Sequence, residues 1–151
     1  RIPALIYNLK KQLMKTLAFA ILLLVFGNIC SAQNETTNLE VTINNVKNDN
    51  GVVLLALHSE DTFMKLKPVK SLQAKIVDGH IKATFTGIAK GEYAVLAIHD
   101  ENENGTMDFN TNGMPKESYG ASNNDMSFGP PVWSDSKFIV GRENQSIAIR
   151  F

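Results

Sequence analysis

The sequence predicts an all-β domain, an antiparallel β-sandwich of about seven strands of immunoglobulin-like or transthyretin-like type. Three observations predict it. Several short segments place apolar residues at every second position, as strands with one buried face do. Turns that contain glycine separate these segments, and no regular alternation of strands with helices is present. Such a pattern is typical of two antiparallel sheets packed face to face.

Three segments show the two patterns typical of strands, which are alternation of apolar with polar residues and a continuous apolar run. Leu39, Val41 and Ile43 alternate with polar residues, so we expect a half-buried strand in residues 39–46. Residues 52–57, VVLLAL, and 93–98, YAVLAI, are apolar at nearly every position. Because these two segments are apolar on both faces, we expect them to be central strands.

The clearest turn signal is Asp78-Gly79, which separates the alternating segments LQAKIV (72–77) and HIKATF (80–85). Asp-Gly fits a two-residue hairpin turn, in which both residues have positive φ. After a possible cap at Ser59 the sequence predicts a short helix, which Pro68 limits to about two turns. Near the end of the chain, KFIV (137–140) and QSIAIRF (145–151) predict two more strands.

A long segment, residues 99–136, interrupts this regular pattern. Loops of more than about 15 residues are uncommon in compact domains and are usually functional or disordered. This loop contains four aromatic residues, so we expect it to be ordered and to pack over one end of the sandwich. Two of them, Tyr119 and Trp133, are candidates for stacking on a sugar or a peptide. The alternative is that both rings simply cover the end of the core.

The N-terminal segment predicts export. From Met14 the chain has one lysine, an apolar run and then Cys30-Ser31-Ala32, the pattern of a secretory signal peptide cleaved before Gln33. We therefore expect residues 1–32 to be an upstream extension plus a signal peptide, 33–38 a disordered leader, and 39–151 a single domain. The predicted protein is periplasmic or extracellular and does not span the membrane. A membrane anchor and a lipoprotein modified at Cys30 are the alternatives.

Charge and cysteine content narrow the function. Four of the fifteen bases lie in residues 1–32 and all fifteen acids lie beyond them, so residues 33–151 have eleven bases, fifteen acids and a net charge of −4. This balance argues against nucleic acid as a partner, because such binding depends on Lys and Arg at phosphates. The single cysteine, Cys30, lies in the predicted signal peptide, so the domain must be held together by its core.

Residues 100–108, DENENGTMD, match the first nine positions of a calcium-binding loop. Such loops supply oxygen ligands at alternate positions around a glycine at position six, here Gly105. The twelfth position is a threonine instead of glutamate, so Glu117 or water would have to complete the shell. The alternative is a solvated loop whose Asn and Asp side chains form turns. The predicted Ca²⁺ ligands are Asp100, Asn102, Asn104, the Thr106 carbonyl, Asp108 and Glu117.

These features leave two functions open. The first is a calcium-stabilised binding or interaction module that takes a glycan or a protein at the cell surface or in the periplasm. The second is a small secreted hydrolase that uses His99 and Asp100 with Ser118 or Ser122 as nucleophile. A triad needs a serine, a base and an orienting carboxylate, and these residue types are nearby. No nucleophile-elbow pattern is present, which favours the binding module.

The segments GEYAVLAIHDENENGTMDFNTNGMPKESYGASN (91–123) and GPPVWSDSKFIV (129–140) carry a resemblance to a known family. Together they resemble an uncharacterised bacterial family of secreted proteins, domain of unknown function 2141. The likeness covers residues 39–151. It implies export and a β architecture, and it implies no particular activity.

Overall fold

The computed structural model describes residues 11–15, 35–125 and 129–151. The chain divides into two compact units, residues 1–34 and Glu35–Phe151. In the first, residues 11–15 are helical; the signal peptide predicted from Met14 and the cleavage site before Gln33 lie almost wholly outside the described residues. Among the described residues, no helix is both long and apolar enough to cross a membrane. The second unit is the β domain described below.

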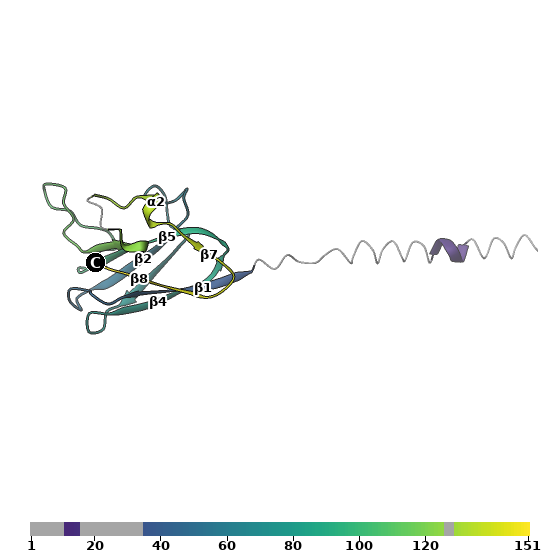
Figure 1. Ribbon diagram of the computed structural model, residues 1–151, viewed down its shortest axis with the longest axis horizontal. Coiled ribbons are helices and arrows are strands. Elements are labelled where there is room, and N and C mark those ends of the chain that lie inside the picture. Colours follow the sequence, from purple (N-terminus) through teal and green to yellow (C-terminus); the bar gives the residue numbers. More distant parts are fainter. Residues whose placement is uncertain (1–10, 16–34, 126–128) are drawn as a thin grey trace, which may run out of the picture. The chain divides into compact units, whose positions relative to one another are not determined.

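The β domain consists of two sheets, as predicted (Figure 1). The first has the strand order β4-β1-β8, and the second has the order β3-β2-β5-β6, with β7 also paired to β5. The strands are β1 (Thr36–Ile43), β2 (Val52–His58), β3 (Lys70–Lys75), β4 (Ile81–Ala89), β5 (Gly91–Asp100), β6 (Tyr119–Ala121), β7 (Phe138–Val140) and β8 (Gln145–Ile149).

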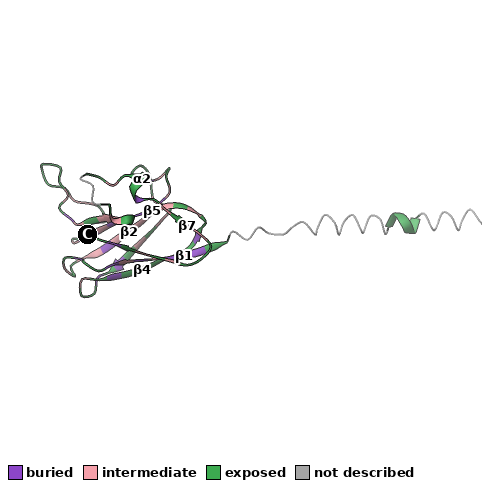
Figure 2. Ribbon diagram, in the orientation of Figure 1, coloured by how far each residue is buried: buried purple, intermediate pink, exposed green. Residues whose placement is uncertain are grey.

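The core lies between the two sheets, and the alternation of side chains along the strands explains it. In β1, Leu39, Val41 and Ile43 are fully buried, while the residues between them are half-buried. Burial alternates in the same way along most of β2, and the buried residues of the domain lie mainly on its strands (Figure 2). One apolar side of each strand therefore faces the other sheet and leaves water, which is the main force that stabilises such a domain. Among the described residues, Phe85 on β4 is the largest side chain that is fully buried.

The prediction of two central strands is confirmed. β2 lies between β3 and β5, and β5 lies between β2 and the short strands β6 and β7. β2 and β5 are antiparallel, with Val52 opposite Asp100 at one end and His58 opposite Ala94 at the other. This register means that the segments that follow β2 and β5 leave the sheet at opposite ends.

The Asp78-Gly79 turn is also confirmed, although its two arms do not form a hairpin as predicted. Asp78 and Gly79 have φ values of 52° and 74°, and Val77 and His80 exchange two backbone hydrogen bonds of 3.0 Å. Beyond that pair the arms separate, because β3 pairs with β2 in one sheet and β4 pairs with β1 in the other. The turn therefore links the two layers.

The described residues contain eight strands, in agreement with the predicted sandwich of about seven. One pair, β1 with β8, is parallel within the otherwise antiparallel sheets. β1 begins at Thr36 and pairs with β4, so it includes the last three residues of the leader expected to be disordered. The pairing of Thr36 and Thr37 with residues 89 and 88 accounts for their order.

The helix predicted after Ser59 is wrong, because residues 60–66 form hydrogen-bonded turns. The backbone N–H groups of Thr62 and Phe63 both donate to the Ser59 carbonyl, at 3.1 and 3.0 Å. Met64 then has a φ of 55°, a left-handed conformation that a continuing α-helix cannot contain. The segment ends after little more than one turn.

The His58 side chain links β2 to this turn, and it predicts a pH dependence of stability. With the proton on Nδ1, the ring donates to the Thr62 carbonyl at 3.1 Å. Burial lowers the pKa of His58 from its ordinary value of 6.5, and the bond to Thr62 opposes this only in part. Because the folded state disfavours the charged ring, the stabilisation is complete above pH 6.5 and is lost as the pH falls through the lowered pKa.

We therefore expect the melting temperature of the wild-type domain to fall more steeply between pH 7.5 and pH 5 than that of His58→Gln. Thermal melting monitored by circular dichroism over this range measures the difference. His80→Gln, the same substitution at an exposed histidine, is the matched control. Parallel pH profiles for wild type and His58→Gln would contradict the assignment.

Candidate functional site

The acidic loop, residues 100–108, begins at the end of the central strand β5. Asp100 is the last residue of β5 and only 1% of its surface is exposed. Gly51, in the turn before β2, lies directly against it: a Cβ on Gly51 would stand 2.0 Å from the Asp100 carbonyl oxygen. Asp100 is thus fixed by a central strand and by close backbone packing, and the loop grows out of an ordered base.

The Asp100 carboxylate organises the loop that follows it. Its Oδ1 accepts the backbone N–H of Asn104 at 3.1 Å, and its Oδ2 accepts that of Gly105 at 2.7 Å. Gly105 has a φ of 80°, the left-handed region that a glycine adopts readily. The loop therefore turns around the buried Asp100 carboxylate, and the turn is made at Gly105, the glycine that the motif requires.

The next two predicted ligands continue this pattern. The Asn102 Oδ1 accepts the Asn104 N–H at 3.1 Å, and the Asn104 Oδ1 accepts the Thr106 N–H at 2.8 Å. The Thr106 hydroxyl also donates to the Asn104 Oδ1, at 3.0 Å. These are the local side-chain turns typical of Asn and Asp, and they hold the residues at positions one to seven in a tight loop.

Asp108 closes the loop on itself. Its Oδ2 accepts the Nδ2 groups of both Asn102 and Asn104, at 2.7 and 3.2 Å. The amides at the third and fifth positions thus lie beside the carboxylate at the ninth. Five of the six predicted ligands, Asp100, Asn102, Asn104, Thr106 and Asp108, therefore belong to one continuous hydrogen-bonded network.

Glu117 lies across the base of the same loop. It is 7% exposed, and its two oxygens accept the backbone N–H groups of Glu101 at 3.2 Å and of Asp108 at 3.0 Å. The Lys116 N–H donates to the Asp108 carbonyl at 2.8 Å, which ties the two segments together a second time. Glu117 therefore connects the start and the end of the acidic loop, whereas its position in the sequence indicates only that it is the nearest carboxylate beyond the motif.

Glu101 faces away from this network. Its Oε2 accepts the Asn48 Nδ2 at 3.4 Å, and its Oε1 lies 4.0 Å from the His99 Nδ1. Because its carboxylate is directed to the turn before β2, Glu101 is a suitable control for substitutions of the predicted ligands.

The donor set suits a hard cation better than zinc. Among the described residues, no group of three His, Cys, Asp or Glu side chains is close enough to hold a metal ion. A cation in the acidic loop would depend on amide and backbone oxygens in addition to the carboxylates, and such ligands fit Ca²⁺. Zinc prefers nitrogen and sulfur ligands, which this network does not supply.

Three of the four residues proposed for a hydrolase, His99, Asp100 and Ser122, have side chains that bond to other groups. His99 is fully buried, its Nε2 lies 2.8 Å from the Asn50 carbonyl, and its ring stacks on Phe151 at a centroid distance of 6.3 Å. The Ser122 hydroxyl is also buried; it accepts the Val95 N–H at 3.0 Å and donates to a backbone carbonyl. The Ser118 carbonyl accepts the His99 backbone N–H. The geometry therefore adds no support to the hydrolase hypothesis.

The two aromatic candidates have different surroundings. The Trp133 ring is half-buried and packs edge-on against Phe63, with centroids 5.6 Å apart. Tyr119 is 38% exposed; it lies on β6 opposite Ile98, and its hydroxyl donates to the Gly129 carbonyl at 3.4 Å. Within the described residues, no ring contact joins Tyr119 to Trp133. Of the two rings, Tyr119 is the more open to a ligand.

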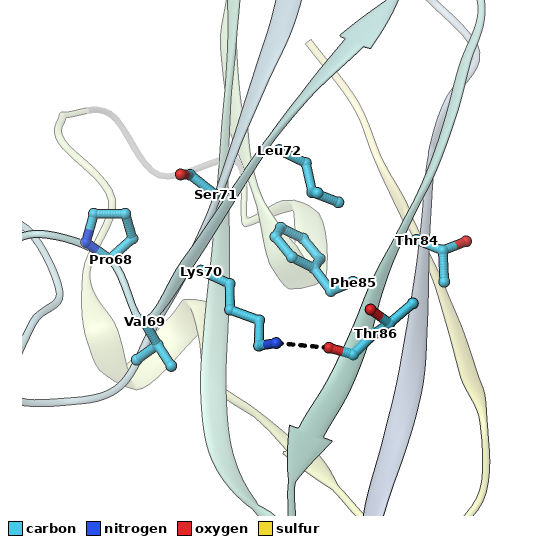
Figure 3. Close-up of a pocket in the computed structure, with 8 residues that line it drawn as sticks. All are labelled: Pro68, Val69, Lys70, Ser71, Leu72, Thr84, Phe85 and Thr86. Carbon is cyan, nitrogen blue, oxygen red and sulfur yellow. Dashed lines mark hydrogen bonds between the residues drawn. The ribbon is translucent and has the colours of Figure 1, made fainter.

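An open cavity of about 400 Å³ lies elsewhere, between the edge strands β3 and β4 (Figure 3). Leu72 and Phe85 form part of its wall, and the Lys70 Nζ donates across it to the Thr86 carbonyl at 2.7 Å. Lys70 pairs with Leu57, near the end of β2 that lies beside the start of β5. The acidic loop begins at the opposite end of β2, where Val52 pairs with Asp100, so the cavity lies far from it. No sequence motif indicated this cavity, because it lies between β3 and β4, which belong to different sheets.

Fold and site together define a small β-sandwich with an oxygen-rich loop at the end of a central strand. The chain belongs to the family described as an uncharacterized protein conserved in bacteria, DUF2141, whose model matches residues 41–148. This confirms the resemblance found in the sequence. No curated protein and no solved structure matches the chain.

Proposed function

We propose that this protein is an exported binding or interaction module whose acidic loop binds calcium. The observation that carries the proposal is the curled loop around the buried Asp100 carboxylate, in which residues at positions one, three, five and nine of the motif are already linked. A cation that takes the place of the amide groups beside Asp108 would find oxygen donors within a preformed turn. Calcium would then stabilise the loop that projects from β5.

The same network supports a low affinity. To bind an ion, Asp108 has to lose its hydrogen bonds from two amide groups. Both oxygens of the buried Glu117 already accept hydrogen bonds from backbone N–H groups. With two carboxylates as the charged ligands, the dissociation constant should lie at about 10⁻⁴–10⁻³ M, as in extracellular modules. Such an affinity suits a protein that meets calcium outside the cytoplasm.

The partner of the module is a glycan or a protein. Tyr119 supports this, since it is exposed on β6, the short strand that begins two residues after Glu117. A calcium ion that orders the loop would also fix the start of β6. The ring of Tyr119 would then be positioned for stacking on a sugar or packing on a peptide.

The test compares thermal melting of residues 33–151 in millimolar calcium and in EDTA. Calcium should raise the melting temperature, since an ion that binds only the folded state adds about 2.7 kcal/mol at a hundredfold excess over its dissociation constant. Asp100→Asn and Asp108→Asn should abolish most of this response, and Glu101→Gln should retain it. Glu117→Gln should lower the melting temperature in EDTA as well, because one of its two acceptor oxygens is lost.

Asn102→Asp separates a calcium site from a simple turn. The substitution replaces the amide that donates to Asp108 at 2.7 Å by a second carboxylate. In EDTA the two charges repel each other and the melting temperature should fall. In calcium the added charge should enlarge the response beyond that of the wild type. A loss in EDTA that calcium leaves unchanged would show that the loop is a turn without a metal.

A further inference from the structure

A second surface lies at the other end of the domain, in the turn between β2 and β3. We call residues 64–70, MKLKPVK, the basic turn. Met64, Leu66 and Val69 are 56%, 66% and 48% exposed, and Lys65 and Lys67 between them are exposed as well. Large apolar side chains that remain in water next to lysines indicate an interaction surface.

The basic turn stands on an ordered base. Phe63, immediately before it, is 5% exposed and packs edge-on against His58 and Trp133, with centroid distances of 6.0 and 5.6 Å. Met64 has a φ of 55°, a conformation in which a non-glycine residue is strained. The fold therefore buries the phenylalanine and holds the next apolar residues outward, instead of letting them collapse onto the core.

The two ends of the domain differ in charge. Because β2 and β5 are antiparallel, the basic turn leaves the sheet beside Ala94 while the acidic loop leaves it beside Val52. The basic turn contains three lysines and no acid, although Glu60 and Asp61 precede it. The acidic loop contains four acids and no base. In a domain with a net charge of −4, the basic turn is thus the part suited to an anionic partner.

Two of the three lysines, Lys65 and Lys67, form no ion pair with another described residue. Lys70 donates to the Thr86 carbonyl at the mouth of the cavity between β3 and β4 (Figure 3). Lys65 and Lys67 are therefore the ammonium groups available to a partner.

We propose that the basic turn docks the domain on an anionic lipid bilayer. An exposed turn with aliphatic side chains fits a bilayer, whose interface admits apolar groups and whose phosphates attract lysines. Residues 64–67 are exposed and lie outside the lining of the cavity between β3 and β4, which takes only Pro68, Val69 and Lys70 from the basic turn. In this orientation the acidic loop faces away from the lipid, where it meets no anionic surface. The inference holds whether or not that loop binds calcium.

The test is co-sedimentation of residues 33–151 with vesicles in EDTA, which prevents calcium from bridging the acidic loop to lipid. This part of the chain contains every core residue of the β domain, from Leu39 to Ile149. Binding is expected to vesicles of phosphatidylcholine mixed with phosphatidylglycerol, and not to phosphatidylcholine alone. High salt should weaken it. A wild-type domain that binds neither kind of vesicle would overturn the proposal.

Matched lysine variants locate the contact. Lys65→Gln with Lys67→Gln should weaken vesicle binding by about 25-fold, because each lysine near the surface contributes about fivefold. The control, Lys47→Gln with Lys75→Gln, makes the same change of charge at exposed positions near the acidic end. It should bind as the wild type does. Equal losses in both pairs would show attraction by overall charge and would overturn a docking role for the basic turn.

Matched apolar variants test insertion without changing charge. Met64→Asn with Leu66→Asn should weaken binding by tenfold or more. Asparagine tolerates the positive φ of Met64, so folding should persist, and a β-type circular dichroism spectrum checks this. The control, Val77→Asn with Met114→Asn, alters two side chains that are each 60% exposed outside the basic turn. Unchanged binding of the Met64/Leu66 pair would contradict insertion.

Discussion

Gly51→Ala should destabilise the domain by about 3 kcal/mol or more, which corresponds to a fall in melting temperature of about 10 °C or more. The added Cβ would stand 2.0 Å from the Asp100 carbonyl oxygen and 2.8 Å from two Glu101 backbone atoms. These neighbours are backbone atoms at the end of a central strand and cannot rotate away. Gly51 also has a φ of 67°, which disfavours alanine.

Gly113→Ala is the control for this substitution. Gly113 also has a positive φ, 78°, but nothing lies within 4 Å of a Cβ placed there. Its cost should be that of the backbone conformation alone, about 1–2 kcal/mol. Thermal melting of both variants measures the difference. Equal losses of stability in the two variants would show that glycine is needed at position 51 only for its positive φ, and that the close approach to Asp100 contributes nothing.

Phe85→Ala should cost about 3–5 kcal/mol, the typical loss when a buried phenylalanine is truncated. Phe85 is 1% exposed and is part of the core between the two sheets. It also forms a wall of the cavity between β3 and β4, so removing its ring would enlarge a space that is already open on one side. Urea denaturation measures the loss.

Phe109→Ala provides the matched control, since the same side chain is 57% exposed in the acidic half of the long loop. It should change the free energy of unfolding by about 0.5 kcal/mol or less. If the two phenylalanine variants were equally stable, Phe85 would not contribute to the core as the fold requires.

Local patterns in the sequence predicted the parts of the fold that depend on neighbouring residues. Alternation predicted β1, continuous apolar runs predicted the central strands β2 and β5, and Asp78-Gly79 predicted the turn that both positive φ values confirm. Each of these signals is a property of a few consecutive residues.

The features that were missed depend on partners far apart in the chain. The parallel pairing of Leu39 with Gln145 leaves no local trace, and neither does the divergence of β3 and β4 into different sheets. The helix predicted after Ser59 had helix-like composition, but the burial of Phe63 against Trp133 and the left-handed Met64 end it. Tertiary contacts decided the conformation there against local propensity.

The candidate site shows the same division. The spacing of Asp100, Asn102, Asn104 and Asp108 was sufficient to predict that these residues share one loop, and their hydrogen bonds bring them together. Glu117 was predicted only by proximity in the sequence; its bonds to two backbone N–H groups could not be inferred from spacing. The close approach of Gly51 to Asp100 depends on the pairing of β2 with β5 and was not predicted.

The most direct test of calcium binding is a calorimetric titration of calcium into residues 33–151, wild type and Asp100→Asn. The buried Asp100 carboxylate organises the acidic loop, so its loss should remove the site even where the domain remains folded. We expect saturable binding by the wild type with a dissociation constant of about 10⁻⁴–10⁻³ M, and none by the variant. Absence of binding by the wild type, or equal binding by both proteins, would contradict the proposed calcium site.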